Sequence, residues 1–290
     1  MVIDFVMAVC VAVGIGCFRF LLNAMFFKNF AIRILYNGNR PLKIDEARQV
    51  KIEKMSESMW KFSYFLIGVI WSVSIICNES WSRDIHDYFR GWPDHPLKVS
   101  MKLFYIWQCG IYIYSIVAIL TWETRRKDFP IMLSHHIITI ILIVYSYLVR
   151  IGCIIIALHD TCDIFLEVAK VLKYIQAEMG ASIFFGIFAI SWFLLRLVYF
   201  PFWVIRSSSY LSIEFISASE NFIIMYYVFN SMLISLLFFH VYWWKLICSM
   251  ILTQIKNRAN VGEDVRSGHT FRLGFVGLCG SWYESWYRHK

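Results

Sequence analysis

Long apolar runs alternate with shorter polar segments along this chain. Each run has close to the ~20 residues that an α-helix needs to cross the hydrocarbon core of a bilayer. The pattern therefore predicts an all-α polytopic membrane protein with about seven transmembrane helices, the last long enough to tilt or to extend past the membrane. The predicted spans cover residues 3–24, 61–78, 101–121, 131–149, 153–174, 182–205 and 222–250.

Lysine and arginine gather in alternate connections between these spans, most clearly in "ETRRKDFP" after the third span. Because positive charges favour the cytosolic side, the first, third and fifth connections and the C-terminus are predicted to be cytosolic. The N-terminus and the remaining connections then face the lumen. The sequon Asn78-Glu79-Ser80 lies in the second connection, on that translocated side, which makes Asn78 a candidate for N-glycosylation.

The flanking segments have their own character. Residues 1–27 lack the basic start of a cleaved signal peptide and predict a retained first transmembrane helix with a lumenal N-terminus. Residues 28–60 are cationic and amphipathic, which predicts a cytosolic linker at the membrane surface. Residues 256–290 predict a cytosolic tail whose end is basic and aromatic.

The composition supports a membrane protein. Hydrophobic residues make up 59% of the 290 residues and charged residues only 17%, with a mean hydropathy of +0.58. A soluble domain of this length carries more surface charge. The net charge of +8 reflects basic loops rather than a nucleic-acid-binding module, so no nucleic-acid partner is expected. The eight cysteines form no CxxC pair, which argues against a zinc module or a disulfide framework.

Polar and ionisable side chains nevertheless concentrate in the fourth and fifth spans, where an Asp, Lys or Arg costs roughly 2.5–3.5 kcal/mol on insertion. In the fifth span, four of them recur at i, i+3, i+7 and i+10 and so form one stripe of a helix. A short turn makes the two spans an antiparallel hairpin whose polar faces can meet. The residues are Ser134, His135, His136, Thr139 and Ser146 in the fourth span, and His159, Asp160, Asp163, Glu167 and Lys170 in the fifth.

Depth along the two helices predicts which of these groups lie together. The histidine pair lies roughly 8–9 Å along the fourth span from its cytosolic start, at 1.5 Å per residue. Glu167 and Asp163 lie roughly 10 and 16 Å from the cytosolic end of the fifth span. The pair is therefore expected nearest Asp163 and Glu167, with His159 and Asp160 deeper, in a pocket that opens toward "TRRKDF".

Polar residues in this pattern can also serve a structural role or bind a metal. As structural groups they would form hydrogen bonds between packed helices, although this many on two neighbouring helices is hard to account for that way. Histidines and carboxylates could bind Fe or Zn, but the HxxH-type boxes of membrane di-iron enzymes are missing. Counting His135, His136 and His159 as the histidines in spans gives too few ligands, so no metal is expected. The histidines assigned elsewhere are His86, His95, His240, His269 and His289.

The segment "MLSHHIITIILIVYSYLVRIGCIIIALHDTCDIFLEVAKVLKY", residues 132–174, resembles the Lag1 motif of the ceramide synthases, within the TLC-domain family. The likeness spans roughly residues 55–255, and the upstream "RRKDF" also fits. The absence of a homeobox-like insert after the first span favours a plant-type or fungal-type member. Residues that match the motif are His135, His136, Thr139, Ser146, Tyr147, Arg150, Gly152, His159, Asp160, Asp163, Leu166, Glu167 and Lys170.

The resemblance implies that the protein acylates a sphingoid base, such as sphinganine or phytosphingosine, to (dihydro)ceramide in the endoplasmic reticulum membrane. Fatty acyl-CoA is then a co-substrate, and no resident cofactor is expected. The spans after the first would form a bundle around a lipid cavity, and homo- or heterodimers would form. Catalysis would rest on His135, His136, His159, Asp160 and Asp163, with Ser134, Thr139, Ser146, Glu167 and Lys170 supporting the pocket.

The chemistry of amide formation suits these residue types. A protonated amine must lose a proton before it attacks a thioester, and imidazole is a suitable base. One of His135 and His136 is therefore expected to be the base or a transient acyl acceptor. Asp163 or Asp160 would orient an imidazole, and His159 is a candidate donor to the oxyanion.

Basic residues at the cytosolic rim are candidates for the CoA site. Arg125, Arg126 and Lys127 could hold the CoA phosphates, although ordinary positive-inside anchoring accounts for them equally well. The functional alternative is a TLC-domain protein without enzymatic activity that senses, transfers or traffics lipids. Such a protein would not need the complete set of histidines and aspartates.

Overall fold

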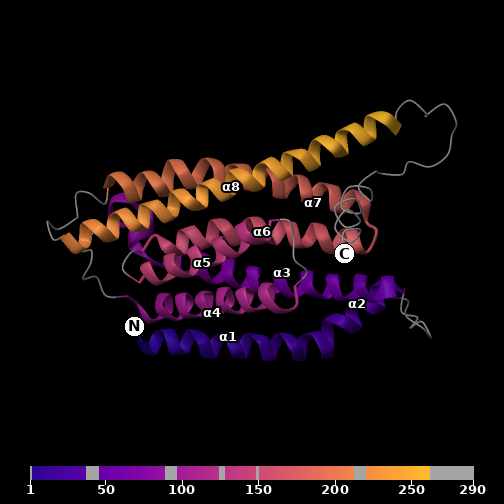
Figure 1. Cartoon of the computed structure of the whole chain (residues 1–290), viewed down its shortest axis with the longest axis horizontal. Helices are drawn as coiled ribbons and strands as arrows, with labels where there is room; N and C mark the ends of the chain where they lie inside the picture. Colours follow the sequence, from indigo (N-terminus) through magenta and orange to yellow (C-terminus); the bar gives the residue numbers. More distant parts are fainter. Residues whose placement is uncertain are drawn as a thin grey trace.

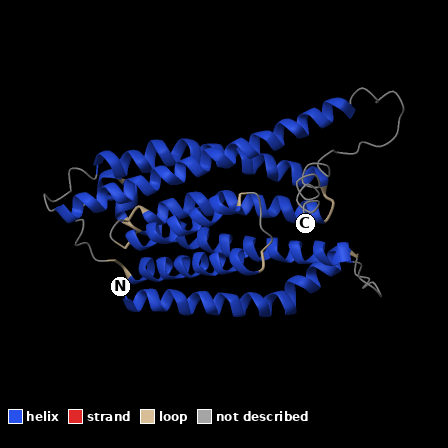
Figure 2. Ribbon diagram, in the orientation of Figure 1, coloured by secondary structure: helices blue, strands red, loops and turns tan. Residues whose placement is uncertain are grey.

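The computed structural model describes residues 2–36, 46–88, 97–123, 128–147, 150–211 and 220–261. Throughout these ranges the regular structure is helical and contains no strand (Figure 2). This confirms the all-α fold class. The long helices run nearly parallel to one another along the long axis of the molecule (Figure 1).

The helices follow the predicted spans in order. Several of them join without a break. α1 passes through the π-helical turn η1 into α2, and α7 passes into the π-helical segments η4 and η5. The bounds are α1 Val2–Leu22, η1 Asn23–Phe27, α2 Lys28–Leu35, α3 Glu46–Asn78, η2 Ser80–Arg83, η3 Ile85–Tyr88, α4 Val99–Thr121, α5 Phe129–Tyr145, α6 Gly152–Tyr174, α7 Glu178–Ser191, η4 Trp192–Ile205, η5 Ser207–Leu211 and α8 Glu220–Val261.

Five helical stretches of the described chain are long and apolar enough to cross a membrane, and α5 is a shorter apolar helix. The remaining predicted span, α6, is not counted among them, because its sequence "HDTCDIFLEVAK" carries too many charged residues. The apolar stretches confirm a multi-pass membrane protein. The same charged residues that lower the hydropathy of α6 are those of the predicted site.

Two helices extend beyond their predicted spans. α3 starts at Glu46 and therefore includes part of the predicted linker 28–60. α8 has 42 residues, about 63 Å at the usual helical rise, and so exceeds the ~30 Å hydrocarbon thickness. Residues 37–45 of the linker and residues 262–290 of the tail lie outside the described residues.

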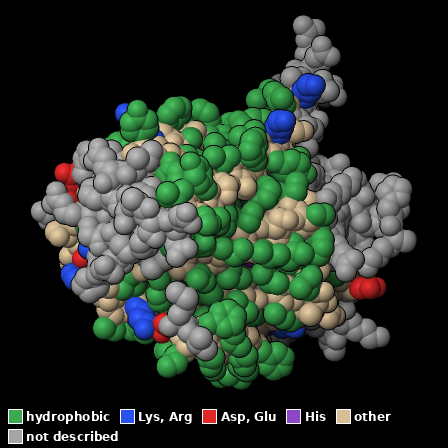
Figure 3. Space-filling model, turned by 60° about the vertical axis from the view of Figure 1, so that its left-hand side comes forward, with side chains coloured by type: hydrophobic (Ala, Val, Ile, Leu, Met, Phe, Trp, Pro, Cys, Tyr) green, Lys and Arg blue, Asp and Glu red, His purple; other side chains and the backbone are tan. Residues whose placement is uncertain are grey.

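The six helices after the first close into a ring. α3 packs against α6 and α4, α4 against α5, and α5 against α8, which returns through η4 and α7 to α6. α1 lies outside this ring, along α4 (Figure 1). The predicted bundle of the later six spans is therefore confirmed. Figure 3 shows a face covered mainly by hydrophobic side chains, with charged side chains toward its edges, as a lipid-facing surface requires.

The outer helix α1 approaches α4 closely at Gly110. A Cβ atom at this position would lie 2.6 Å from Val11 Cγ1 and 3.2 Å from the backbone oxygen of Ala8. Valine is stiff at χ1, and the carbonyl belongs to a helix backbone, so neither neighbour can move away at low cost. Glycine at position 110 thus sets the distance between α1 and the bundle.

Replacement of Gly110 by alanine should therefore destabilise the protein by about 1–3 kcal/mol, the usual cost of overpacking a tight contact. The thermal unfolding midpoint of purified protein in detergent should fall. Gly14→Ala on α1 is the matched control, because a Cβ at Gly14 meets nothing within 4 Å. An unchanged midpoint for Gly110→Ala would contradict the close packing of α1 on α4.

Candidate functional site

The first histidine of the pair points into the bundle. His135 is buried on α5, and its ring lies edge-on to Trp243 of α8 with centroids 5.3 Å apart. It also faces the ring of His159 on α6 at 6.5 Å and Phe239 at 6.4 Å. Its Nδ1 is buried and has no hydrogen-bond partner among the described residues. His135 therefore has an unpartnered nitrogen in the interior of the bundle.

The second histidine makes different contacts. His136 Nδ1 lies 2.7 Å from the carbonyl oxygen of Met132, and because a carbonyl only accepts, this nitrogen carries the proton and donates it. The ring packs edge-on against Tyr112 of α4 at 5.6 Å. The two adjacent imidazoles thus face different neighbours, as their angular separation on a helix predicts.

His159 forms a buried pair with His240 of α8. His159 Nδ1 donates to the carbonyl oxygen of Ile155 at 2.6 Å, so in a neutral ring Nε2 is the acceptor. His240 Nε2 lies 2.9 Å from His159 Nε2 and is then the donor. His240 is fully buried, and its Nδ1 has no partner in the described part of the chain. The tautomer of His159 is therefore fixed from two sides.

Asp163 pairs with an arginine of the π-helical segment. Arg196 Nη2 donates to Asp163 Oδ2 and to the carbonyl oxygen of His159, both at 2.8 Å. The guanidinium lies over the ring of Trp192, 3.9 Å from its centroid, a favourable cation–π arrangement. Arg196 is 3% exposed, so this is an ion pair in the interior of the bundle.

The other two carboxylates of the α6 stripe have separate partners. Glu167 Oε1 accepts from Lys170 Nζ at 2.7 Å on the same helix. Asp160 Oδ2 accepts from Gln108 Nε2 of α4 at 3.0 Å. In the described chain, the side-chain partners of Asp160 and Asp163 are thus an amide and a guanidinium rather than an imidazole.

The relative depth of the histidines differs from the depth predicted from the sequence. His159 lies alongside His135, whereas the prediction put His159 deeper and Asp163 and Glu167 nearest the pair. That prediction placed the cytosolic start of α5 and the cytosolic end of α6 at the same level. The end of α6 instead continues past the start of α5, where Tyr174 and Val171 pack in a cluster with Met55 and the linker helix α2.

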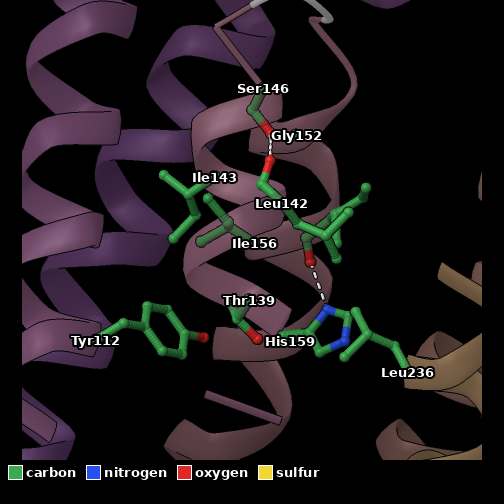
Figure 4. Close-up of a pocket in the computed structure, with 10 residues that line it drawn as sticks. Tyr112, Thr139, Leu142, Ile143, Ser146, Gly152, Ile156, His159 and Leu236 are labelled. Atoms are coloured by element: carbon green, nitrogen blue, oxygen red, sulfur yellow. Dashed lines mark hydrogen bonds between the residues drawn. The ribbon is translucent and has the colours of Figure 1, made fainter. Parts of the chain in front are cut away.

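A small pocket of about 20 Å³ lies between α4, α5, α6 and α8, with His159 on its wall (Figure 4). This volume suffices for about one water molecule. At the end opposite His159, Ser146 packs against Gly152, the first residue of α6, and closes the pocket. This contact is so close that a Cβ atom at position 152 would lie 1.9 Å from Ser146 Oγ. The lining residues are Tyr112, Thr139, Leu142, Ile143, Ser146, Gly152, Ile155, Ile156, His159 and Leu236.

Two hydroxyl groups in this pocket are satisfied by their own helix. Thr139 Oγ1 donates to the carbonyl oxygen of His135 at 2.7 Å, and Ser146 Oγ donates to that of Leu142 at 2.8 Å. Hydroxyls bonded in this way offer no donor to the pocket. The pocket wall is therefore mostly apolar.

The remaining predicted residues lie apart from this group or outside the described chain. Ser134 is exposed on α5 and does not line the pocket. Asn78 is exposed at the end of α3, and its glycosylation stays a prediction. The candidate CoA ligands Arg125, Arg126 and Lys127 lie outside the described residues.

Sequence reasoning missed three partners, Gln108, Arg196 and His240. The assignment of His240 to a place outside the spans was wrong, since it lies within the predicted span 222–250 and in the middle of α8. Each of the three is a polar residue inside an apolar run, and this signal could have identified them. Such a residue is costly to insert into a membrane unless it has a partner. Among the described residues, no group of three His, Cys, Asp or Glu side chains has the geometry to hold a metal ion.

Comparison with known proteins identifies the family. Residues 54–249 match the TLC domain. "ASC1-like protein 3" of Oryza sativa subsp. japonica is 54% identical over 260 residues, covering 88% of this chain and 92% of its own length. "Ceramide synthase LOH2" of Arabidopsis thaliana is 50% identical over 268 residues, covering 91% and 90%.

A more distant relative has a similar name. "Ceramide synthase 4" of Mus musculus is 33% identical over 218 residues, covering 74% of this chain and 54% of its own length. The plant proteins are more similar than this animal protein and match almost end to end. The chain therefore belongs to the TLC-domain family and, within it, to the plant-type ceramide synthases.

Proposed function

We propose that this protein transfers the acyl group of a fatty acyl-CoA to the amine of a sphingoid base and so makes (dihydro)ceramide. The relatives named ceramide synthase support the reaction class. The observation that carries the assignment to this site is the buried contact between His135 on α5 and His159 on α6, next to the carboxylates of α6. By the same resemblance, we propose the endoplasmic reticulum membrane as its location and a homo- or heterodimer as its assembly.

The two imidazoles of the pair suit different tasks. His135 faces the interior and has an unpartnered Nδ1, so we assign it as the base that takes the amine proton or as the transient acyl acceptor. In the acceptor route, an imidazole nitrogen bonds to the thioester carbon as the C–S bond breaks, and the thiolate leaves as CoA. The neutral amine then attacks the acyl carbon, the bond from that carbon to the imidazole nitrogen breaks, and the proton that the amine loses passes to the CoA thiolate. His136, held by Met132 and Tyr112, fixes the helix around it.

In the pair of His159 and His240, no N–H group of His159 is free to donate a hydrogen bond to an oxyanion. In the neutral pair, His159 gives its Nδ1 proton to Ile155, and its Nε2 accepts from His240, so no N–H is left for a substrate oxygen. We therefore assign His159 to the pocket wall beside His135 rather than to oxyanion binding. The mostly apolar wall beside His135 then keeps bulk water away from the acyl intermediate.

The basic rim supplies the remaining part of the proposal. We assign Arg125, Arg126 and Lys127 to the phosphates of CoA, since guanidinium and ammonium groups bind phosphate well. They precede α5 by a few residues in the chain, and His135 lies in the second turn of that helix.

His135→Ala and Asp163→Asn should each fold and yet convert sphinganine and acyl-CoA to ceramide at least about 100-fold more slowly, since the first loses the base and the second loses the ion pair that Arg196 forms beside His159. Ceramide is measured by mass spectrometry and free CoA thiol by a colorimetric assay. Glu79→Gln, just past the end of α3, is the control. Full activity in both variants would remove the proposed mechanism, and lipid binding without CoA release by the wild type would indicate a lipid carrier instead.

His240 should act through His159. His240→Leu removes the donor to His159 Nε2 and should lower kcat about 10–100-fold, whereas His240→Gln keeps an N–H donor and should recover much of the loss. Because the two rings act as one unit, the double variant His159→Ala/His240→Leu should be no slower than His159→Ala alone. Additive losses in this double-mutant cycle would contradict the coupling.

Replacement of Arg125, Arg126 and Lys127 by glutamine should raise the KM for acyl-CoA about tenfold or more without changing the KM for sphinganine. The increase should shrink at high salt, because ionic strength screens exposed charges. An unchanged KM for acyl-CoA, with the protein still correctly inserted by protease protection, would show that the three residues serve only as membrane anchors.

A further inference from the structure

The α6 stripe carries three carboxylates, and the described chain supplies cations for two of them. Arg196 pairs with Asp163 at 2.8 Å, and Lys170 pairs with Glu167 at 2.7 Å. Asp160 is 3% exposed, and no Lys, Arg or His among the described residues forms an ion pair with it. Asp160 is therefore the one carboxyl group of the stripe without a cationic partner among the described residues.

A neutral amide is the one side-chain partner of Asp160 in the described chain. Gln108 Nε2 donates to Asp160 Oδ2 at 3.0 Å, and Gln108 is 2% exposed. An amide stabilises a carboxylate by a hydrogen bond but does not balance its charge, and a buried charge without a counter-charge is costly. Asp160 Oδ1 and Gln108 Oε1 have no other partner in the described ranges. Each of the two side chains thus keeps an acceptor oxygen outside their shared hydrogen bond.

Room for this pair is provided by the neighbouring helix α3. A Cβ atom at Gly68 would lie 2.7 Å from Asp160 Oδ2 and 3.0 Å from Gln108 Nε2. Both atoms are the polar ends that form the hydrogen bond, so any side chain at Gly68 would push them apart. Three helices, α3, α4 and α6, therefore build one polar niche around Asp160.

We infer that Asp160 and Gln108 form the binding subsite for the ammonium group of the amine substrate. A primary ammonium brings the missing positive charge and three N–H donors, which match the carboxylate and the amide oxygen. That this amine is a sphingoid base rests on the proposed function. The preceding residue along the chain, His159, lines the pocket and faces His135, so the Asp160 subsite and the proposed base contact the same turn of α6.

The subsite predicts a preference for charge that can be measured by binding alone. Two probes of equal chain length separate the contribution of the charge from that of the chain. N,N-dimethylsphinganine carries a tertiary ammonium group that the enzyme cannot acylate to an amide, and octadecane-1,3-diol has no amine. Wild-type protein in detergent should bind the amine on the order of 30-fold more tightly, the lower range for a buried charge pair. Tryptophan fluorescence titration gives both affinities.

Asp160→Asn should remove this preference, because asparagine keeps the oxygen that accepts from Gln108 and loses only the charge. Glu79→Gln, the same chemical change just past the end of α3, should keep the wild-type ratio. A wild-type ratio in Asp160→Asn would overturn the subsite. Gly68→Ala gives an independent test in which the charge is retained: the displaced pair should weaken amine binding and leave diol binding unchanged.

Steady-state kinetics separate this role from an acid–base role. In Asp160→Asn, the KM for sphinganine should rise on the order of 30-fold while the KM for acyl-CoA stays the same. A fall in kcat with unchanged KM for sphinganine would overturn the subsite in favour of a role in proton transfer. Wild-type protein that shows the charge preference but makes no ceramide would contradict the proposed function and leave the subsite supported.

Discussion

The cost of a buried charge inside a membrane protein governs the arrangement of this bundle. α6 carries carboxylates that no lipid-facing position could accommodate, so the helix has to be surrounded by protein. The neighbouring helices supply what each carboxylate needs: Arg196 from η4 for Asp163, and Gln108 from α4 for Asp160. Close packing of α3 against α6, with glycine at position 68, completes the enclosure. The helices that pack against α6 thus cover its polar face.

The π-helical winding of η4 belongs to the same arrangement. This segment of 14 residues includes Pro201, which has no N–H to give to the helix and disturbs regular α-helical bonding before it. π-helical turns are rare and occur frequently at functional sites. Here the winding carries Arg196, whose Nη2 joins the backbone of His159 to Asp163. The altered winding therefore positions Arg196, which links the backbone of the pocket-lining residue His159 to the carboxylate of Asp163.

Prediction from the sequence succeeded where the signal is local. The run lengths predicted the helices, and spacing at i, i+3 and i+7 predicted the stripe that contains Asp160, Asp163 and Glu167. The partners of these groups could not be predicted, because Arg196 lies 33 residues from Asp163 and His240 lies 81 residues from His159. No pattern along one helix fixes which face of another helix it meets. The prediction of the depth of His159 was wrong for a similar reason, because the ends of neighbouring helices in a bundle need not lie at one level.

The site also shows why two adjacent histidines need not share one role. Residues next to each other on a helix point about 100° apart, so one can enter the bundle interior while the other packs between helices. His135 takes the inner direction, toward His159 and Trp243, and Trp243 is held in turn by its indole N–H, which donates to Asp128 Oδ2 at 3.1 Å. His136 is fixed by Met132 at its protonated nitrogen. An imidazole that reacts in the interior needs an unpartnered nitrogen there and a rigid surrounding, and His135 has both.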